Sequence, residues 1–274
     1  MYVIIITMIR VAHIMPTEYQ ENLVADGMCF DIQMSLAHLV LEDVSYRELF
    51  SKPIRSSFLI LDNSAFELGE SIDSNDLMLA IAKVSPDEIV LPDSLYNHNS
   101  TMELMQDFIA RHRDYLSNMS LMAVPHGKSI GEYIESYRIM SSLDYVSTIG
   151  IGTIYNDKFA EDGILGREKI VRELVRRNLV ADKAHHLLGL GDSGNIELIR
   201  LSKYDFIRSC DSSAAYVNAC TGTRITSDGY KKDRIKVDFS ANFDKRTYKI
   251  MLHNMKTLEE AAKRGEDSRS RSRE

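Results

Sequence analysis

The chain has 274 residues, of which 44% are hydrophobic, and a formal net charge of −7 at pH 7. This length suits one domain with a large core, and the acidic balance excludes a global basic field, so any nucleic-acid contact must come from a local patch. The three cysteines contain no CxxC pair, which argues against a structural zinc site and a disulfide framework.

The first fifteen residues are apolar but lack the basic start of a signal peptide, and Arg10 and His13 interrupt them. We therefore expect neither a signal peptide nor a membrane span. We expect a cytoplasmic location, which would be the host-cell cytoplasm if a phage encodes the protein. A second methionine, Met8, leaves open whether the preceding seven residues are a long start or an extra strand.

Short apolar runs that end on polar or glycine-rich tips recur at intervals that fit one strand and one crossover helix. Eight strands are predicted, at 8–14, 32–40, 58–62, 88–92, 121–126, 147–152, 185–190 and 205–210. The second of them could equally be helical. Helical periodicity is clear at 74–84, 101–116, 129–140 and 167–179. The pattern predicts an α/β protein with a parallel (β/α)8 TIM-type barrel and no zinc subdomain.

The composition changes after Thr223, because residues 224–274 contain 14 basic residues against 9 acidic ones. We therefore expect a barrel domain at 1–223 and a basic C-terminal segment at 224–265 whose closing helix packs on the barrel. The polar, repetitive residues 266–274 are predicted to be a disordered tail.

Three carboxylates follow predicted strands: Asp62 within FLILDNSAFE, Asp93 within EIVLPDS and Asp211 within DFIRSCDSS. In barrels of this kind, functional groups gather at the carboxyl ends of the strands. An aspartate after a strand is also a common helix N-cap, and this alternative stays open for Asp93 and Asp211. Three of them at the ends of different strands favour a site.

These motifs, in this order, resemble those of the tRNA-guanine transglycosylase superfamily. The resemblance covers roughly residues 8–220 and rests on DNSAFE at 62–67, LPDS at 91–94, GIG at 150–152, LLGLGD at 187–192 and the carboxylate of IRSCDSS. It is strongest toward the compact phage and bacterial relatives that insert 7-deazaguanine bases into DNA. The CxCxxC zinc motif of the tRNA enzymes is absent from this sequence, which weakens a tRNA substrate more than it weakens the chemistry.

The resemblance implies that Asp62 is the general acid/base, that Asp93 binds the N1 and N2 edge of the guanine-like ring, and that Asp211 is the nucleophile. Exchange at C1′ of a nucleoside makes demands that glycosidases meet with two carboxylates. The nucleophile of the eighth strand has two other possible matches. Asp205 also matches a family aspartate, and a shift of register places Arg208 where the nucleophile is expected. We prefer Asp211 because the strand carries it to the carboxyl end.

Other residues near the strand ends are candidates for binding the base. Glycines let a flat ring approach the backbone, although close packing explains them equally well. His126 could contact a base or a phosphate, or serve a structural role, and Glu67 could orient Asp62 or face solvent. His185 and His186 receive little weight, because they stand at the start of the seventh strand. The full set of substrate-binding candidates is Asp93, Asn63, Ser64, Phe66, His126, Gly150, Gly152 and Gly189.

Nucleic-acid contacts are predicted for Arg208, Lys231, Lys232 and Arg234, with Tyr216 and Tyr230 available to stack on bases. A solvated charged face is the competing interpretation of these cations. Because C1′ is inaccessible inside a duplex, the enzyme would have to flip the nucleotide or act on single strands.

The resemblance, together with the three strand-end carboxylates, thus implies a pentosyltransferase that exchanges guanine in DNA for a 7-deazaguanine such as preQ0 without a metal or redox cofactor. By resemblance, the modified phage DNA would resist restriction enzymes. Exchange in tRNA is the first alternative. A barrel that binds purines or nucleic acid without turnover, or that hydrolyses the glycosidic bond, is another. Dimerisation is common in the superfamily, so a homodimer is one option.

Overall fold

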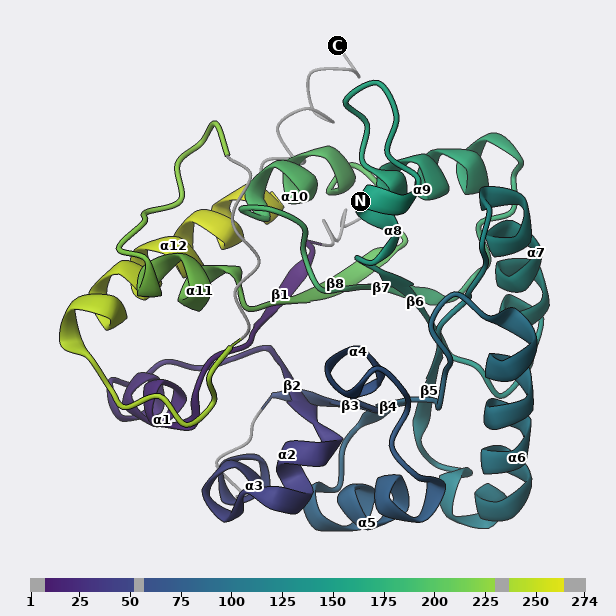
Figure 1. Cartoon of the computed structure of the whole chain (residues 1–274), viewed down its shortest axis with the longest axis horizontal. Helices are drawn as coiled ribbons and strands as arrows, with labels where there is room; N and C mark the ends of the chain where they lie inside the picture. The colour runs from purple at the N-terminus through teal and green to yellow at the C-terminus, as the bar shows by residue number, and fades with distance from the viewer. Residues whose placement is uncertain (1–7, 52–56, 230–236, 264–274) are drawn as a thin grey trace, which may run out of the picture. The chain divides into compact units, whose positions relative to one another are not determined.

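A computed structural model describes residues 8–51, 57–229 and 237–263. Eight parallel strands follow one another in the order β1-β8-β7-β6-β5-β4-β3-β2, and helices alternate with them along the chain (Figure 1). This is the (β/α)8 TIM-type arrangement that the sequence predicts. No helix in the described ranges is long and apolar enough to cross a membrane.

All eight predicted strands are present, and most are shorter than expected. Their bounds are Arg10–His13 (β1), Ile32–Leu36 (β2), Phe58–Asp62 (β3), Glu88–Val90 (β4), Ser120–Ala123 (β5), Thr148–Gly152 (β6), Ala184–Leu188 (β7) and Ile207–Ser212 (β8). The predicted strand at 32–40 is only half right. Ile32, Met34 and Leu36 are buried at strand spacing, but Ala37 and Val40 are buried at helical spacing, so a helix begins directly after β2.

The predicted outer helices are confirmed to within a few residues at their ends. The described helices are Thr17–Ala25 (α1), Ala37–Glu42 (α2), Val44–Ser51 (α3), Ala65–Leu68 (α4), Ser74–Val84 (α5), His98–Leu116 (α6), Ile130–Ser141 (α7), Tyr155–Lys158 (α8), Gly166–Arg176 (α9), Asn195–Leu201 (α10), Ala214–Cys220 (α11) and Lys245–Lys263 (α12). Side-chain caps fix several starts: Asp73 accepts from the N–H of Asn75 before α5, and Asn97 accepts from Ser100 N–H at α6.

The contacts of the chain divide it into two compact units. The first unit contains residues 1–28, 153–168 and 185–274, and the second contains residues 29–152 and 169–184. In the second unit, β3 is a continuous apolar strand whose Leu59, Ile60 and Leu61 are fully buried. Helices α5, α6 and α7 cover one face of strands β3 to β6 (Figure 1). Because Leu59, Ile60 and Leu61 are successive residues and point alternately to the two faces, β3 is buried on both faces, as a parallel strand requires.

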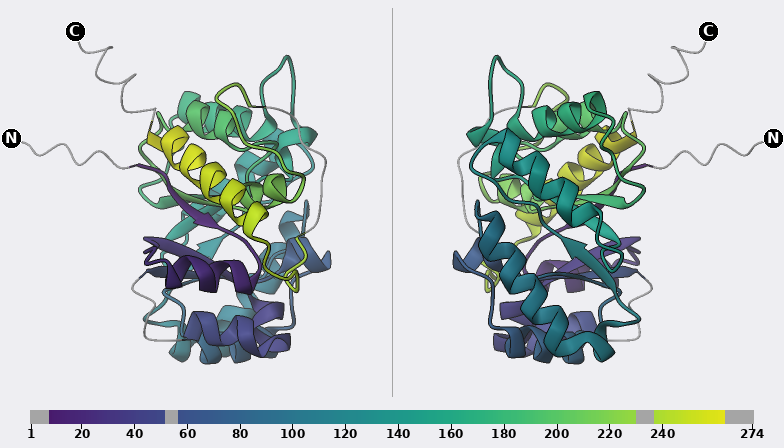
Figure 2. Two further views of the ribbon diagram at one scale, coloured as in Figure 1. Left: turned by 90° about the vertical axis from the view of Figure 1, so that its left-hand side faces the viewer. Right: turned by 90° about the vertical axis from the view of Figure 1, so that its right-hand side faces the viewer.

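In the first unit, β1 pairs with β8 so that Ala12 lies beside Asp211. The predicted closing helix is α12, which packs on α10, α11 and β1 (Figure 2). Its inner face carries Met251, Met255 and Leu258, all buried at helical spacing. The remaining predicted features of the C-terminus, Lys231, Lys232, Arg234 and the tail at 266–274, lie outside the described residues.

Two helical glycines provide a matched pair of stability tests. A Cβ at Gly166 would lie 1.8 Å from the backbone oxygen of Tyr155, whereas a Cβ at Gly131 would meet only Ser129 Oγ, at 3.8 Å. Because backbone cannot move aside cheaply, we expect Gly166→Ala to lower the free energy of unfolding by about 3 kcal/mol. Gly131→Ala should raise it by about 0.5–1 kcal/mol. Urea unfolding of both variants measures the difference, and equal stabilities would contradict the close approach of Gly166 to α8.

Candidate active site

The three predicted carboxylates all lie at or just beyond the carboxyl ends of their strands. Asp62 is the last residue of β3, Asp211 is the last but one of β8, and Asp93 follows β4 by three residues. The N-cap alternatives are wrong for both open cases. Asn97 caps α6, and Ser212 Oγ, not Asp211, accepts the N–H of Ala214 at the start of α11. Both aspartates therefore serve something other than capping.

The turn after β3 is held by its own polar side chains. Asp62 Oδ2 accepts the N–H of Ser64 at 2.8 Å, and Asn63 Oδ1 accepts the N–H of Ala65 at 2.9 Å. Ser64 has a φ of +64°, a left-handed conformation that a residue other than glycine adopts only where its surroundings impose it. These bonds fix the direction in which the Asp62 carboxylate leaves the strand.

The buried hydroxyl of Ser64 connects this turn to the start of α2. Ser64 Oγ lies 2.8 Å from His38 Nδ1 and accepts the backbone N–H of His38 at 3.2 Å. Burial lowers the pKa of His38, and the nearby Glu42 opposes that shift. Lowering the pKa favours the neutral ring at this contact. The turn is thus anchored on one side by α2.

Asn63 joins the end of β3 to the end of β4. Its Nδ2 donates to Leu91 O and to Asp93 Oδ1, both at 2.7 Å, and its side chain is buried. Asp93 Oδ2 lies 2.5 Å from His126 Nε2, and both side chains are nearly inaccessible to solvent. The second unit therefore contains a buried chain of polar contacts, Asn63–Asp93–His126, across three successive strand ends.

The hydrogen bonds of His126 identify its tautomer. Its Nδ1 accepts the backbone N–H of Tyr96 at 3.2 Å, so the ring proton belongs on Nε2, from which it is donated to Asp93. Asp93 Oδ1 accepts from Asn63 and Oδ2 accepts from His126, and each oxygen has a second lone pair. Asp93 is consequently fixed in place while it keeps the capacity to accept from a ligand.

Other predicted binding residues of this unit differ in exposure. Gly150 and Gly152 are buried within β6, whereas Phe66 is 62% exposed on the short helix α4. Leu68, 49% exposed, lies on the same helix turn, and Glu67 is exposed between them. An aromatic ring that projects from a strand-end turn in this way is available for stacking.

In the first unit, one oxygen of Asp211 is held by two donors. Oδ1 accepts the backbone N–H of Gly189 at 2.8 Å and lies 3.2 Å from Nε2 of the fully buried His186. The other ring nitrogen, Nδ1, lies 2.8 Å from Ser209 Oγ. Within the described part of the chain, no hydrogen bond reaches Asp211 Oδ2. The carboxylate is thus oriented through one oxygen and presents the other.

The expectation that His186 lies away from the carboxyl end of the strands is wrong, because its side chain reaches Asp211. The strand begins at Ala184, one residue earlier than predicted, and the pairing of β7 with β8 is irregular between His185 and His186. His186 therefore pairs with Ser209 and reaches the carboxylate two residues farther along β8. His185, in contrast, packs edge-on against Phe206. The competing Asp205 precedes β8 and is exposed.

Gly189, a predicted base-binding residue, positions Asp211 through its N–H. Its φ is +68°, and a Cβ there would lie 2.9 Å from the side chain of Thr153. Its carbonyl accepts from Arg167 Nη2 at 2.7 Å, and that of Leu188 accepts from Arg167 Nη1 at 3.0 Å. This loop conformation therefore depends on glycine and on one arginine.

Sequence reasoning missed Arg167 and its partner Glu197. The two form an ion pair of 2.8 Å with side chains 0% and 1% exposed. Glu197 Oε2 also accepts the N–H of Gly191, at 2.9 Å. In the sequence, Arg167 begins a charged helical turn, GREK, that is typical of an exposed helix start. No local pattern distinguishes it from a surface arginine.

Of the four residues predicted to contact nucleic acid, Arg208 is the one that lies within the described ranges. Arg208 is half-buried in β8 and donates to Ser209 Oγ at 3.1 Å. The prediction that Tyr216 stacks on bases is wrong. Tyr216 is 5% exposed, and its ring meets that of Tyr19 edge-on at 5.0 Å. Tyr230 lies outside the described residues.

No protein-family model matches the sequence, and a search of curated proteins returns no significant match.

Proposed function

We propose that this protein is a base-exchange transglycosylase that replaces guanine in DNA with a 7-deazaguanine base of the preQ0 type. The observation that carries the proposal is the state of Asp211. One of its oxygens is fixed by Gly189 N–H and His186, and the other accepts no hydrogen bond from the described residues. A carboxylate oriented in this way, at the end of a barrel strand, suits nucleophilic attack on a sugar carbon.

In the first half of the proposed reaction, Asp211 Oδ2 attacks C1′ of the deoxyguanosine. The C1′–N9 bond breaks, its electron pair leaves with guanine, and the leaving base takes a proton from the carboxylic acid of Asp62. The product is an ester between Asp211 and C1′. The strand-end turn that holds Asp62 through Ser64 N–H supports a fixed direction for this proton transfer.

In the second half, the Asp62 carboxylate removes the N9 proton of the incoming 7-deazaguanine. The nitrogen then forms the new bond to C1′, and Asp211 leaves as a carboxylate. Atoms and charge balance over the two halves, and both residues return to their starting protonation states. No metal or redox cofactor enters the scheme.

The proposed base contacts involve the polar chain of the second unit. Asp93 keeps lone pairs for the N1 and N2 hydrogens of the base, and its fixed position supports recognition of a donor edge. Phe66 offers an exposed ring on which a base could stack. DNA is favoured over tRNA because the cysteine motif of the tRNA enzymes is absent from the sequence. Restriction enzymes would then fail on the modified phage DNA.

Nucleoside analysis tests this function directly. DNA and tRNA from cells that express the protein and are supplied with preQ0 are digested and examined by mass spectrometry. We expect a deoxynucleoside of the 7-deazaguanine in DNA and none in cells with an empty vector. A modified ribonucleoside would move the substrate to tRNA. Abasic sites without a new nucleoside would indicate a hydrolase, and no change in either pool would contradict the transferase proposal.

A further inference from the structure

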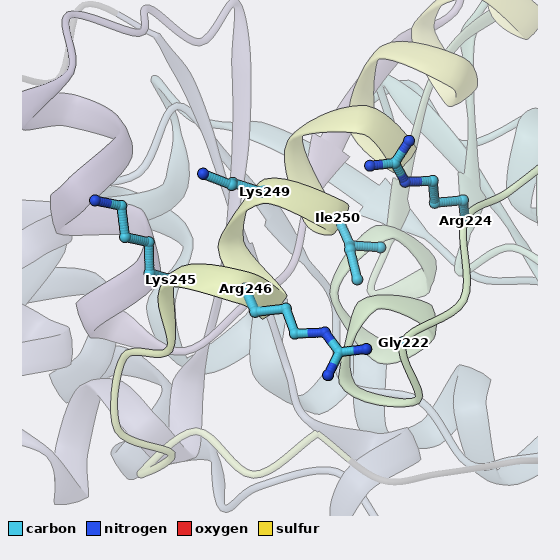
Figure 3. A pocket seen from close by; sticks show the side chains of 6 residues that line it. All are labelled: Gly222, Arg224, Lys245, Arg246, Lys249 and Ile250. Atoms are coloured by element: carbon cyan, nitrogen blue, oxygen red, sulfur yellow. The ribbon is translucent and has the colours of Figure 1, made fainter.

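We infer that a basic pocket at the start of α12 binds the sugar-phosphate backbone of duplex DNA. The pocket has a volume of about 560 Å³ and is lined by Gly222, Arg224, Lys245, Arg246, Lys249 and Ile250 (Figure 3). It lies entirely within the first unit. The inference deepens the proposed function, because it rests on DNA as the substrate and names where the flanking duplex is held.

Four of the six lining residues are cationic, and all four are exposed. No carboxylate in the described ranges forms an ion pair with Arg224, Lys245, Arg246 or Lys249. The nearest acidic group along the chain, Asp244, is engaged as a helix cap, since its Oδ2 accepts the N–H of Thr247 at 2.7 Å. That backbone hydrogen bond holds the pKa of Asp244 below its usual value. Asp244 also interacts electrostatically with Arg246, but one carboxylate beside four cations leaves the pocket with a net positive charge.

Fold stability does not explain these cations. Lys245 and Arg246 occupy the first two positions of a 19-residue helix, where the helix dipole disfavours positive charge. Arg224, from a separate segment, adds a third guanidinium or ammonium group to the same pocket. Like charges brought together at an unfavourable helix end cost stability, and an anionic ligand would offset that cost.

The pocket is built on a rigid support. Asn254 is fully buried on α12, and its Oδ1 accepts the N–H of Ile225 at 2.8 Å while its Nδ2 donates to Thr223 O at 3.1 Å. These bonds grip the backbone on both sides of Arg224. The arginine is thus held in the pocket wall by fixed backbone.

The arrangement of the side chains favours an extended polyanion over a compact one. Figure 3 shows Lys245 and Lys249 extending to one side of the helix, and Arg246 extending toward Gly222. They do not converge on one point, as they would around a single phosphate ion. Among the described residues, the polar side chains that line the pocket carry hydrogen-bond donors and no acceptor, which suits phosphate oxygens. Phosphate contacts of this kind position a duplex and carry no sequence information directly.

Binding of a fluorescent DNA duplex, measured by anisotropy over a range of salt concentrations, tests the inference. The triple variant Arg224→Gln/Arg246→Gln/Lys249→Gln should bind at least about tenfold more weakly at low salt, and its log Kd against log salt should be flatter by about 2–3. A charge-matched control, Lys83→Gln/Arg113→Gln/Lys203→Gln, removes three exposed cations elsewhere. The slope of log Kd against log salt for this control should stay within about 1 of the wild-type slope, which corresponds to one phosphate contact.

The single variants Arg224→Gln, Arg246→Gln and Lys249→Gln keep the test falsifiable if the triple variant folds poorly: each should flatten the slope by about 1, and a wild-type slope in all three would overturn the inference. A further variant conserves charge. Arg224→Lys/Arg246→Lys/Lys249→Arg retains every charge and should retain the salt dependence. A wild-type slope in the glutamine variant, or equal losses in the control, would overturn the inference. Binding of tRNA or of anionic phospholipid vesicles through these residues, with no binding of duplex DNA, would overturn it as well.

The outcome is separable from that of the proposed function. If DNA binding depends on the pocket but no modified nucleoside forms in cells, the pocket inference stands and the exchange proposal fails. If modified DNA forms and the glutamine variant binds like the wild type, the exchange proposal stands and the pocket inference fails.

Discussion

Replacing Asp211 with asparagine is expected to abolish base exchange, with a loss of at least about 10⁴-fold in kcat. Asparagine has the same shape, and its Oδ1 can still accept from Gly189 N–H, so the fold should be retained. Its amide nitrogen replaces the oxygen that we propose attacks C1′. Exchange is measured as incorporation of radiolabelled 7-deazaguanine into DNA by the purified protein.

The covalent intermediate gives a second measurement of the same prediction. Wild-type protein incubated with DNA should form an adduct that migrates as a shifted band on a denaturing gel, and Asp211→Asn should form none. The matched control is Asp205→Asn, which alters the exposed aspartate that precedes β8. Activity lost in Asp205→Asn and retained in Asp211→Asn would transfer the nucleophile to Asp205. Full activity in both would contradict an aspartyl intermediate on β8.

Replacing Arg167 with methionine is expected to lower the free energy of unfolding by about 3–5 kcal/mol. The change leaves Glu197 buried without its partner, and it removes the donors to the carbonyls of Leu188 and Gly189. For a domain of this size the melting temperature should fall by about 10 °C. Denaturant unfolding followed by circular dichroism measures the loss.

Two further variants distinguish the buried pair from charge in general. Arg176→Met removes an arginine that pairs with Glu173 on the surface, and little change is expected because such pairs are screened by solvent. Arg167→Lys keeps the charge but not the forked geometry that serves two carbonyls and a carboxylate, so it should fall between wild type and Arg167→Met. Equal stabilities of Arg167→Met and Arg176→Met would show that the buried pair contributes nothing particular.

The strand ends could be predicted because each strand of a parallel barrel has a recognisable local sequence pattern. Each strand is buried on both faces, so it appears as a short apolar run, and its carboxyl end appears as a sudden change to polar residues or glycine. Asp62 and Asp211 could be placed from that pattern alone. The boundary at Leu36 could not, because an apolar strand that continues directly into an amphipathic helix shows no break in hydrophobicity.

The partners of these carboxylates were not predictable, since they come from other strands. His186 reaches Asp211 only because β7 starts at Ala184 and its pairing with β8 is irregular. Likewise, Asn63, Asp93 and His126 stand far apart in sequence and meet because β3, β4 and β5 are neighbours. Register between strands depends on non-local packing, which no short window of sequence contains.

The fold class, the eight strands and the positions of the three carboxylates could be predicted from the sequence, because periodicity and strand-end composition are local properties. Other features follow from the packing of distant segments: the groups that orient the carboxylates, the burial of Tyr216, the buried ion pair of Arg167, and the pocket that Arg224 shares with α12. Hydrogen bonding, burial and the clustering of like charges depend on which distant segments pack together, and the packed chain is the first level at which these properties exist.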